Sequence, residues 1–473
     1  MADLDLLYTP AVELAGRIRR KELSPVELVD AVLARIEATQ PTINAFITDT
    51  AETAQTEAKA AEQAVMADRP LGPLHGIPFS VKDLTPTAGV RTTMGSAIFA
   101  DQVPAEDAVP VARARAAGAI LVGKTTTPEF GHKALTDGPL FGRTVNPWDH
   151  SRTCGGSSGG AAATVSLGMA PLAFGTDGGG SVRIPAACCG IVGLKATLGR
   201  IPNVHAPDSF ANISYIGPMT RTVADNRLLY EVMGGPDPRD VHAIRPFAAD
   251  QRLPEGRLEG VRIGWMAQVG NRIDPEVLAQ AEAVVRVLDG MGAVVEPVEH
   301  DFASLEREFL IILQSGLCAR LRRYLPEYRG RIDVSLRTTI ERGSAWSAED
   351  LQRAGMVRTE LFRRMQKEFE RYDFLLSPTL AAPALPVTQD AFAPVIVDGE
   401  PAGQLRGAWY PYTWPFNLTG HPALTIPSGW STAKLPTAVQ IVAPFYAEAR
   451  LFDLATRLES ARPWAHQRPP EPA

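Results

Sequence analysis

Cysteine is scarce in this chain of 473 residues, and its scarcity bears on the kinds of site we expect. The four cysteines are Cys154, Cys188, Cys189 and Cys318, and no two of them have CxxC spacing. Four cysteines without CxxC spacing are not typical of a disulfide framework or of a metal cluster. We therefore expect no metal site, and we expect the protein to belong to the reducing cytoplasm.

Long runs of basic or apolar residues are also missing. The net charge is −6, and no basic run resembles the footprint of a nucleic-acid-binding surface. The first ten residues, MADLDLLYTP, carry acid where an export signal would carry base. Residues 154–182 hold one charge, Asp177, but glycines and a proline interrupt them long before the ~20 apolar residues of a membrane span. We expect neither a nucleic-acid nor a membrane partner, and we interpret 154–182 as a buried strand–helix–strand segment.

What the chain does contain is an alternation of helical and strand-like segments. The first 65 residues are predicted to be helical. From about residue 70, short apolar runs separated by glycine and proline are typical of buried strands. These runs are IPFSV (77–81), AILVG (119–123), LAFGT (172–176) and GIVGL (190–194). We therefore predict an α/β fold in which helices cover a mixed or parallel sheet.

The second half of the chain adds a long helical stretch to this pattern. We predict a polar, proline-rich connection at 234–260, a strand at 261–265 and a helix at 275–288. A charged helical region is predicted at 303–372, and two further strands at 374–380 and 423–429. Residues 395–412, between these two strands, are predicted to form a loop over a site. We predict a helical segment at 1–65, followed by one domain at 66–473. Within this domain, the core covers 66–233, a helical insertion covers about 270–372, and the C-terminal return to the sheet covers 374–458.

Residues 118–125, GAILVGKT, match the phosphate-loop pattern GxxxxGK[ST]. In a phosphate loop the four variable residues follow a strand and turn their amides toward phosphate. Here they are Ala, Ile, Leu and Val, which form the strand itself, so the sheet would use their amides. We reject nucleotide binding at this segment.

Residues 155–159, GGSSG, match the nucleophile-elbow pattern GxSxG. An elbow needs an apolar strand directly before it, and an acid and a histidine further along the chain. The preceding residues, TVNPWDHSRTC, contain proline and charge and are typical of a loop, although histidines do follow. A Ser157 nucleophile with a histidine base stays open as the weaker enzyme hypothesis.

A third glycine-rich segment, GTDGGGSVRIPAACCG, covers residues 175–190. The strand-like LAFGT runs into Asp177, and Gly178, Gly179 and Gly180 then precede Ser181. Glycines let a substrate approach the main chain closely, and successive amides there can converge on one oxygen as an oxyanion hole. The alternative is a flexible glycine turn with a solvated serine.

A nucleophilic serine needs a base, and no histidine lies within this segment. Lys82 ends the apolar run of GIPFSVKD (76–83). A lysine with the usual pKa of ~10.4 is almost wholly protonated at pH 7, but burial lowers that pKa by up to ~3–5 units. Asp83 should point to the opposite face of the strand. Lys82 is therefore a candidate base, and an ordinary exposed lysine at a strand end is the alternative.

Four segments together resemble the amidase signature family: GIPFSVKD, CGGSSGG (154–160), GTDGGGSVRIPAACCGIVGLKATLGR (175–200) and NLTGHPALTIPSG (417–429). The clear resemblance covers about residues 66–220, and a weaker one covers 374–458. It implies a single large twisted mixed sheet sandwiched by α-helices. It also implies hydrolysis of the carbon–nitrogen bond of a carboxylic amide, without a cofactor.

The resemblance implies a role for each matching residue. Ser181 would be the nucleophile that forms the acyl-enzyme, and Lys82 would be the base. Ser157 would pass the proton between them, after a cis peptide bond from Gly156. No histidine would take part.

The same resemblance implies supporting roles around the nucleophile. The amides of Gly178, Gly179 and Gly180 would bind the substrate oxygen, while Ser158 and Asp177 would support the loop. Arg183, two residues after the nucleophile, would be a buried ion-pair partner. Two departures from the family pattern lie near the site: Cys154 replaces a common proline, and Leu84 replaces a frequent asparagine.

The resemblance implies a small-molecule amide as the substrate. Aliphatic amides, anilides, carbamates and amino-acid amides are all consistent with it. A homodimer is one assembly that the resemblance allows. The alternative function is that of the glutamine-hydrolysing A subunit of an amidotransferase, which passes ammonia to a partner protein. We discount a catalytically silent binding module, because all three positions of the Ser–Ser–Lys triad are filled.

Overall fold

The structure is a computed structural model that describes residues 4–244 and 252–472. Its main feature is a large sheet of eleven strands. The strands are β1 (Phe46–Asp49), β2 (Pro78–Lys82), β3 (Ile120–Thr125), β6 (Leu172–Asp177), β7 (Val192–Lys195), β8 (Tyr215–Thr220), β9 (Arg262–Trp265), β10 (Val294–Pro297), β11 (Phe374–Pro378), β14 (Ala423–Trp430) and β15 (Pro436–Val442).

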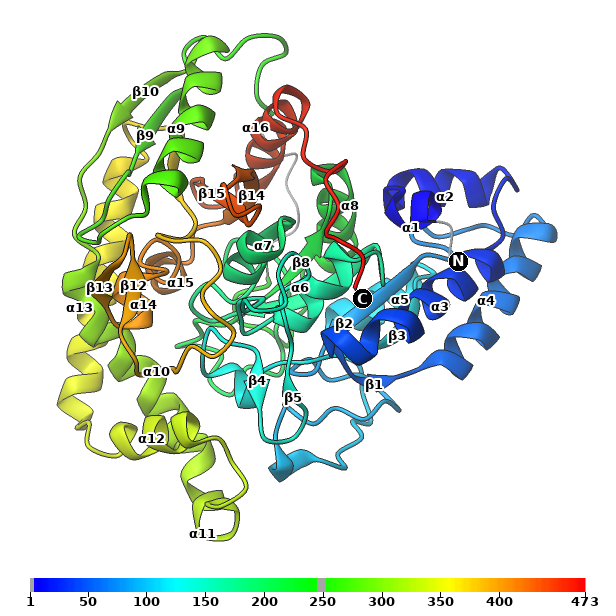
Figure 1. Ribbon diagram of the computed structural model, residues 1–473, viewed down its shortest axis with the longest axis horizontal. Coiled ribbons are helices and arrows are strands. Elements are labelled where there is room, and N and C mark those ends of the chain that lie inside the picture. The colour runs from blue at the N-terminus through cyan, green and yellow to red at the C-terminus, as the bar shows by residue number, and fades with distance from the viewer. Residues whose placement is uncertain (1–3, 245–251, 473) are drawn as a thin grey trace.

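The order of these strands across the sheet is β1-β3-β2-β6-β8-β7-β14-β15-β11-β9-β10 (Figure 1). Strand β2 pairs in parallel with β3 and β6, and β9 pairs in parallel with β10 and β11. The other neighbours are antiparallel. The predicted mixed sheet in an α/β fold is therefore confirmed.

Helices lie on both faces of the sheet. They are α1 (Leu4–Tyr8), α2 (Ala11–Arg19), α3 (Pro25–Ile43), α4 (Ala51–Met66), α5 (Val109–Ala116), α6 (Gly159–Ser166), α7 (Arg183–Cys189), α8 (Val223–Met233), α9 (Pro275–Gly290), α10 (Glu306–Leu321), α11 (Leu325–Tyr328), α12 (Val334–Gly343), α13 (Ala348–Glu368), α14 (Leu405–Ala408), α15 (Pro415–Thr419) and α16 (Glu448–Ala461). Two small hairpins complete the fold, β4 (Asp137–Gly138) with β5 (Gly142–Arg143) and β12 (Val395–Val397) with β13 (Glu400–Gly403).

Because side chains alternate along a strand, the sheet separates the two largest apolar clusters of the core. In β11, Phe374 and Leu376 pack into one apolar cluster, and Leu375 packs into the other. Helices α5, α8, α9 and α16 contribute to the first cluster, whereas α6, α7, α10 and α13 contribute to the second. Because both faces are covered, the central strands are rich in apolar residues, which is the pattern that predicted β2, β3, β6, β7, β9, β11 and β14. The strands β8, β10 and β15 were not predicted.

Several segments differ from the prediction. Phe46–Asp49, within the part predicted to be helical, forms β1 and pairs with β3 at the edge of the sheet. Four residues are too short to show a strand period between two long helices. Residues 154–182 hold one strand rather than two, because residues 154–158 form a loop before α6. The loop predicted at 395–412 contains the β12–β13 hairpin and α14, and part of the polar connection at 234–260 (245–251) lies outside the described residues.

The neighbouring strands β2 and β6 place the candidate residues together. They run in parallel, with Val81 opposite Phe174, so their carboxyl ends meet at one edge. Lys82 is the last residue of β2, and Asp177 is the last residue of β6. The loop before α6 and the glycine segment after β6 therefore reach the same region.

The charged region predicted to be helical contains α10, α11, α12 and α13. Helix α10 packs on α12 and α13, and α13 also packs on α15 near the site. In Figure 1, α11 and α12 extend away from the sheet. No helix within residues 4–244 and 252–472 combines the length and the apolar composition that a membrane span requires.

Candidate active site

Lys82 lies at the centre of a cluster of hydroxyl groups. Its side chain is wholly buried, and its Nζ donates to Ser157 Oγ at 2.7 Å. The same nitrogen lies 2.9 Å from both Ser158 Oγ and Thr176 Oγ1. Asp83 points the other way and accepts from Thr93 and Gly95, as strand alternation predicts.

The surroundings of Lys82 favour its neutral form. Burial lowers the pKa of Lys82 well below its usual value, and the negative charge of Asp177 only partly opposes this shift. Its hydrogen-bonding neighbours are uncharged hydroxyls, which do not hold a proton on the amine as a carboxylate would. A neutral amine in this position can take a proton from Ser157.

Ser157 lies in a tightly packed loop. The peptide bond between Gly156 and Ser157 is cis, as the resemblance implies. A Cβ on Gly156 would lie 2.8 Å from the Ala134 carbonyl carbon, so only glycine fits there without a shift. Ser158 joins this loop to the next, because its amide donates to the Ser181 carbonyl at 3.1 Å and its Oγ donates to the Thr176 carbonyl at 3.0 Å.

Asp177 holds the glycine segment that leads to Ser181. One of its oxygens accepts from the Gly180 amide at 2.7 Å, and the other accepts from the Val182 amide at 3.1 Å. Arg183 forms a fully buried ion pair with the same carboxylate at 2.9 Å, as expected. Burial by itself would raise the pKa of Asp177, but the charge of Arg183 and hydrogen bonds from Arg183 and Asn417 lower it well below its usual value.

The glycine amides are not equivalent. The Gly180 amide is already donated to Asp177, which removes Gly180 from the predicted set of free donors. Within the described residues, the amides of Gly178, Gly179 and Ser181 have no protein acceptor. These three residues are also partly exposed, whereas Lys82 and Ser157 are buried. These three amides are therefore the donors of the segment that remain free to bind a group outside the protein.

Several residues around the site were not predicted as part of it. Thr176 lies in the family-like segment 175–200, and Asn417 is the first residue of the family-like segment 417–429. The sequence therefore contained a signal for both residues. The Asn417 amide group donates to the Asp177 carbonyl and to its carboxylate, each at 2.8 Å. Phe309 comes from α10 and would lie 3.0 Å from a Cβ on Gly179. No motif marks Phe309, because its position depends on how α10 packs.

The structure also shows the surroundings of the rejected phosphate-loop pattern and of the weaker nucleophile-elbow pattern. Lys124, from the phosphate-loop pattern, is buried in β3 and donates to Thr87 Oγ1 at 2.8 Å and Thr92 Oγ1 at 2.9 Å. Burial lowers its pKa to about 7. Among the hydrogen bonds of the described residues, none joins a histidine to Ser157, whereas one joins Lys82 to it. The geometry therefore favours a lysine base over an elbow with histidine.

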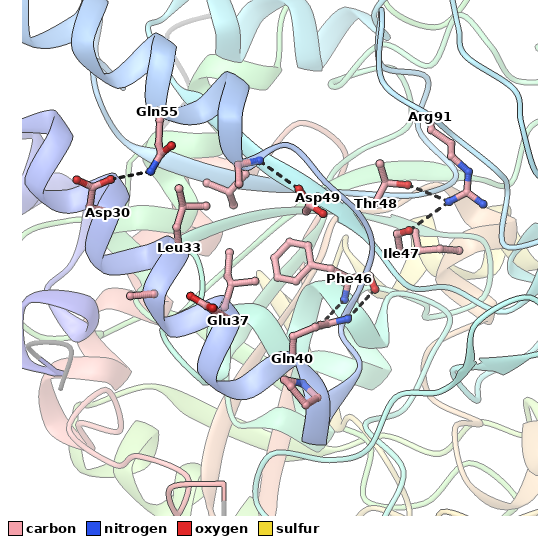
Figure 2. A pocket seen from close by; sticks show the side chains of 15 residues that line it. Asp30, Leu33, Glu37, Gln40, Phe46, Ile47, Thr48, Asp49, Gln55 and Arg91 are labelled. Atoms are coloured by element: carbon pink, nitrogen blue, oxygen red, sulfur yellow. Dashed lines mark hydrogen bonds between the residues drawn. The ribbon is translucent and has the colours of Figure 1, made fainter.

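A groove of about 920 Å³ lies elsewhere, between α3, β1 and α4 (Figure 2). Its lining includes Gln40 and Arg91, whose side chains bond to the outer edge of β1. None of the residues that line it belongs to the predicted triad of Lys82, Ser157 and Ser181. The groove is therefore separate from the cluster around Lys82.

Comparison with known proteins decides the family. The sequence model of the amidase family matches residues 27–452. The chain belongs to the amidase signature family. It is 36% identical to an acylamidase from Rhodococcus erythropolis, over 99% of this chain and 98% of that protein. It is 34% identical to the A subunit of the glutamyl-tRNA(Gln) amidotransferase from Moorella thermoacetica, over 98% and 99% of the two chains.

Solved structures of the amidase signature family share the fold. A bacterial aryl acylamidase aligns with a TM-score of 0.90 at 30% identity, over 97% of each chain. A 6-aminohexanoate cyclic dimer hydrolase in complex with substrate aligns with a TM-score of 0.87 at 30% identity, over 98% of this chain and 99% of that chain. This chain is thus an amide-hydrolysing enzyme of the amidase signature family. Within the described residues, no three His, Cys, Asp or Glu side chains form a group that could hold a metal ion.

Proposed function

We propose that this chain hydrolyses small carboxylic amides through an acyl-enzyme on Ser181. Neutral Lys82 accepts a proton from Ser157, and Ser157 accepts one from Ser181. The Ser181 Oγ then forms a bond to the carbonyl carbon of the substrate. The amides of Gly178, Gly179 and Ser181 stabilise the oxyanion that develops, and each such donor contributes about 3–4 kcal/mol.

The relay then runs in reverse to release the amine. Ser157 gives a proton to the leaving nitrogen and regains one from the Lys82 ammonium. The carbon–nitrogen bond breaks, and the acyl group stays on Ser181 as an ester. Water, deprotonated through the same relay, attacks this ester, and the carboxylic acid leaves as Ser181 takes back its proton.

One observation carries this proposal. The Nζ of a buried lysine lies 2.7 Å from Ser157 Oγ, in surroundings that lower its pKa. A general base must be within hydrogen-bond reach of the proton that it takes and must be deprotonated at the working pH. We also propose a cytoplasmic enzyme, because all four cysteines are free thiols, as is usual in a reducing compartment.

The test is an activity screen of the purified chain alone against primary amides, anilides, carbamates and amino-acid amides. We expect turnover of at least one class without a partner protein. We also expect a chelator to leave the rate unchanged, because protein groups carry every proton transfer. A rate that falls on chelation and returns with added metal would contradict the mechanism.

The alternative is the glutamine-hydrolysing A subunit of an amidotransferase. The 34% identity to the A subunit of the Moorella thermoacetica enzyme supports keeping it. The screen separates the two functions. If the pure chain hydrolyses nothing and acts on glutamine only when partner proteins are added, the alternative replaces the proposal.

We expect an irreversible sulfonyl fluoride or phosphonate probe to label Ser181 and not Ser157. Ser181 is partly exposed after the glycine segment, whereas Ser157 is only 2% exposed beside Lys82. Mass spectrometry of the digested protein identifies the labelled peptide, and Ser181→Ala should abolish labelling. Label on Ser157, with activity lost on mutation of a histidine, would favour the elbow instead.

A further inference from the structure

Thr136 comes from a segment that no sequence motif marked, yet its side chain lies against the loop that carries Ser157. The residue is only 2% exposed. Its Oγ1 donates to the Gly155 carbonyl at 2.7 Å and accepts from the Gly159 amide at 3.2 Å. Gly155 lies two residues before Ser157, and Gly159 lies two residues after it. One hydroxyl group therefore joins the two ends of this loop.

The Gly159 amide needs an acceptor from outside its own helix. Gly159 is the first residue of α6, and the first amides of a helix have no acceptor within it. Ser158 is in the N-cap position, where a serine side chain usually accepts from an amide of the first turn. Here Ser158 Oγ instead donates to the Thr176 carbonyl at 3.0 Å and lies 2.9 Å from Lys82 Nζ. Thr136 therefore gives the start of α6 the side-chain acceptor that Ser158 does not.

Thr136 is itself held in place by its neighbours. Its carbonyl accepts from the Thr144 amide at 3.0 Å. Lys133 and Asp137, on either side of it in the chain, form an ion pair at 2.9 Å. Lys133 also donates at 2.7 Å to Asp333, the N-cap residue of α12. The Thr136 hydroxyl can therefore act as a fixed point for the loop of Ser157.

The two groups that Thr136 joins have no equally strong substitute for its hydroxyl. Among the described residues, the other donor to the Gly155 carbonyl is the Cys154 thiol, whose Sγ lies 3.6 Å away. A thiol is a weak hydrogen-bond donor. Gly155 and Gly159 are both buried, and a buried polar group without a partner is costly. Without the hydroxyl we therefore expect the loop to shift until both groups find new partners.

The proposed mechanism makes such a shift expensive, and this step rests on the proposed function. Ser157 Oγ exchanges protons with Lys82 Nζ, which lies 2.7 Å away, and with Ser181. A misplacement of about 1 Å at a reacting group can cost on the order of 10²-fold in rate. We infer that Thr136 is a positioning residue for Ser157, because its hydroxyl joins both ends of the loop and keeps Ser157 Oγ within reach of its proton partners.

Thr136→Val tests this inference, because valine keeps the shape of threonine and lacks the hydroxyl. On the best amide of the screen we expect kcat to fall by about 10–100-fold. KM should stay within about twofold, because the substrate oxygen is bound by the amides of the glycine segment. Thr136→Ser keeps the hydroxyl and should retain at least about a third of the wild-type kcat. A kcat for Thr136→Ser as low as that for Thr136→Val would contradict a role for the hydroxyl.

A second pair of variants serves if valine does not fold with its methyl against the Gly159 amide. Thr136→Ser and Thr136→Ala differ only by the hydroxyl, and neither adds a methyl in place of Oγ1. We expect kcat of Thr136→Ala to be about tenfold or more below that of Thr136→Ser. Equal values would overturn the inference.

Thr39→Val is the matched control for the loss of a buried hydroxyl. Thr39 is also 2% exposed, and its Oγ1 donates to the Arg35 carbonyl at 2.7 Å within α3, outside the site. This variant should unfold at a somewhat lower urea concentration, as Thr136→Val should, but it should keep the wild-type kcat. An equal fall in kcat in both variants would mean that the rate follows general stability, and Thr136 would have no special role.

A double variant shows whether Thr136 acts through Ser157. In a Ser157→Ala background, adding Thr136→Val should lower the remaining rate by less than about threefold, because no relay hydroxyl is left to position. A repeat of the full loss there would place the effect of Thr136 elsewhere and overturn the inference.

The single variants separate this inference from the proposed function. If Ser157→Ala loses activity but Thr136→Val keeps kcat within about twofold, the positioning role is wrong and the relay stands. If Ser157→Ala itself keeps the wild-type kcat, the proposed relay fails, and the positioning role fails with it.

Discussion

Replacing Lys82 by arginine will lower kcat/KM by about 10²–10⁴-fold, the usual contribution of a general base. Arginine keeps the positive charge, but its pKa above ~12 prevents it from accepting a proton at any working pH. The wild-type amine can do so because burial lowers the pKa of Lys82. Steady-state kinetics on the best substrate of the screen measures the loss.

The pH dependence of kcat/KM should follow from the same need for a deprotonated Lys82 amine. Only the deprotonated amine accepts a proton, so wild-type kcat/KM should rise with pH through the pKa of Lys82 and then level off. Because burial shifts this pKa downward, the plateau should be reached below the usual lysine value of ~10.4. A rate that falls as pH rises through neutrality would contradict a lysine base.

Two variants keep this prediction testable if arginine does not fit a wholly buried position. Lys82→Met has similar length without an amine and should be equally inactive. Lys82→Cys treated with bromoethylamine rebuilds an amine of similar reach and should regain activity, which a purely structural role would not explain. Lys59→Arg, an exposed position on α4, is the control and should retain full activity. If Lys82→Arg keeps more than a few per cent of wild-type kcat/KM, Lys82 is not the base.

The sequence predicted those parts of the site that lie at the ends of buried strands. Lys82 and Asp177 follow strong apolar runs, and parallel strands bring such ends to one edge of a sheet. Ser157 and Ser181 lie in glycine-rich loops directly beside these strand ends. Short sequence motifs therefore located most of the candidate residues. Their roles came from the resemblance to the amidase signature family, whereas the proximity of their segments follows from local sequence and from the pairing of β2 with β6.

Other parts depend on packing between distant segments, which no local pattern encodes. Phe309 reaches Gly179 only because α10, which comes far later in the chain, returns to the sheet. Gly180 was predicted as an oxyanion donor, but the orientation of the Asp177 carboxylate, which takes its amide, is fixed by Arg183 and Asn417. The strand β1 was missed because it is short and lies between two long helices.

Replacing Asp177 by alanine will lower the free energy of unfolding by about 3–5 kcal/mol, the cost of leaving a buried charge without its partner. Arg183 has no exposed surface and directs two nitrogens at this carboxylate. The Gly180 and Val182 amides also lose their acceptor, so the loop before Ser181 loses its shape and kcat falls as well. Urea unfolding followed by circular dichroism measures the first effect, and steady-state kinetics measures the second.

The sign of the pH dependence follows from the same ion pair. Its partners hold the pKa of Asp177 well below the usual ~3.9, so the stabilisation is complete above about pH 4 and is lost only as strong acid protonates the carboxylate. Asp177→Ala should therefore unfold at a lower urea concentration than the wild type throughout the neutral range. Adding Arg183→Met removes the unpaired charge and should recover part of the loss, whereas Glu349→Ala, in an exposed pair with Arg353, should change nothing measurable. If Asp177→Ala unfolds at the wild-type urea concentration, the buried pair does not hold the catalytic loop.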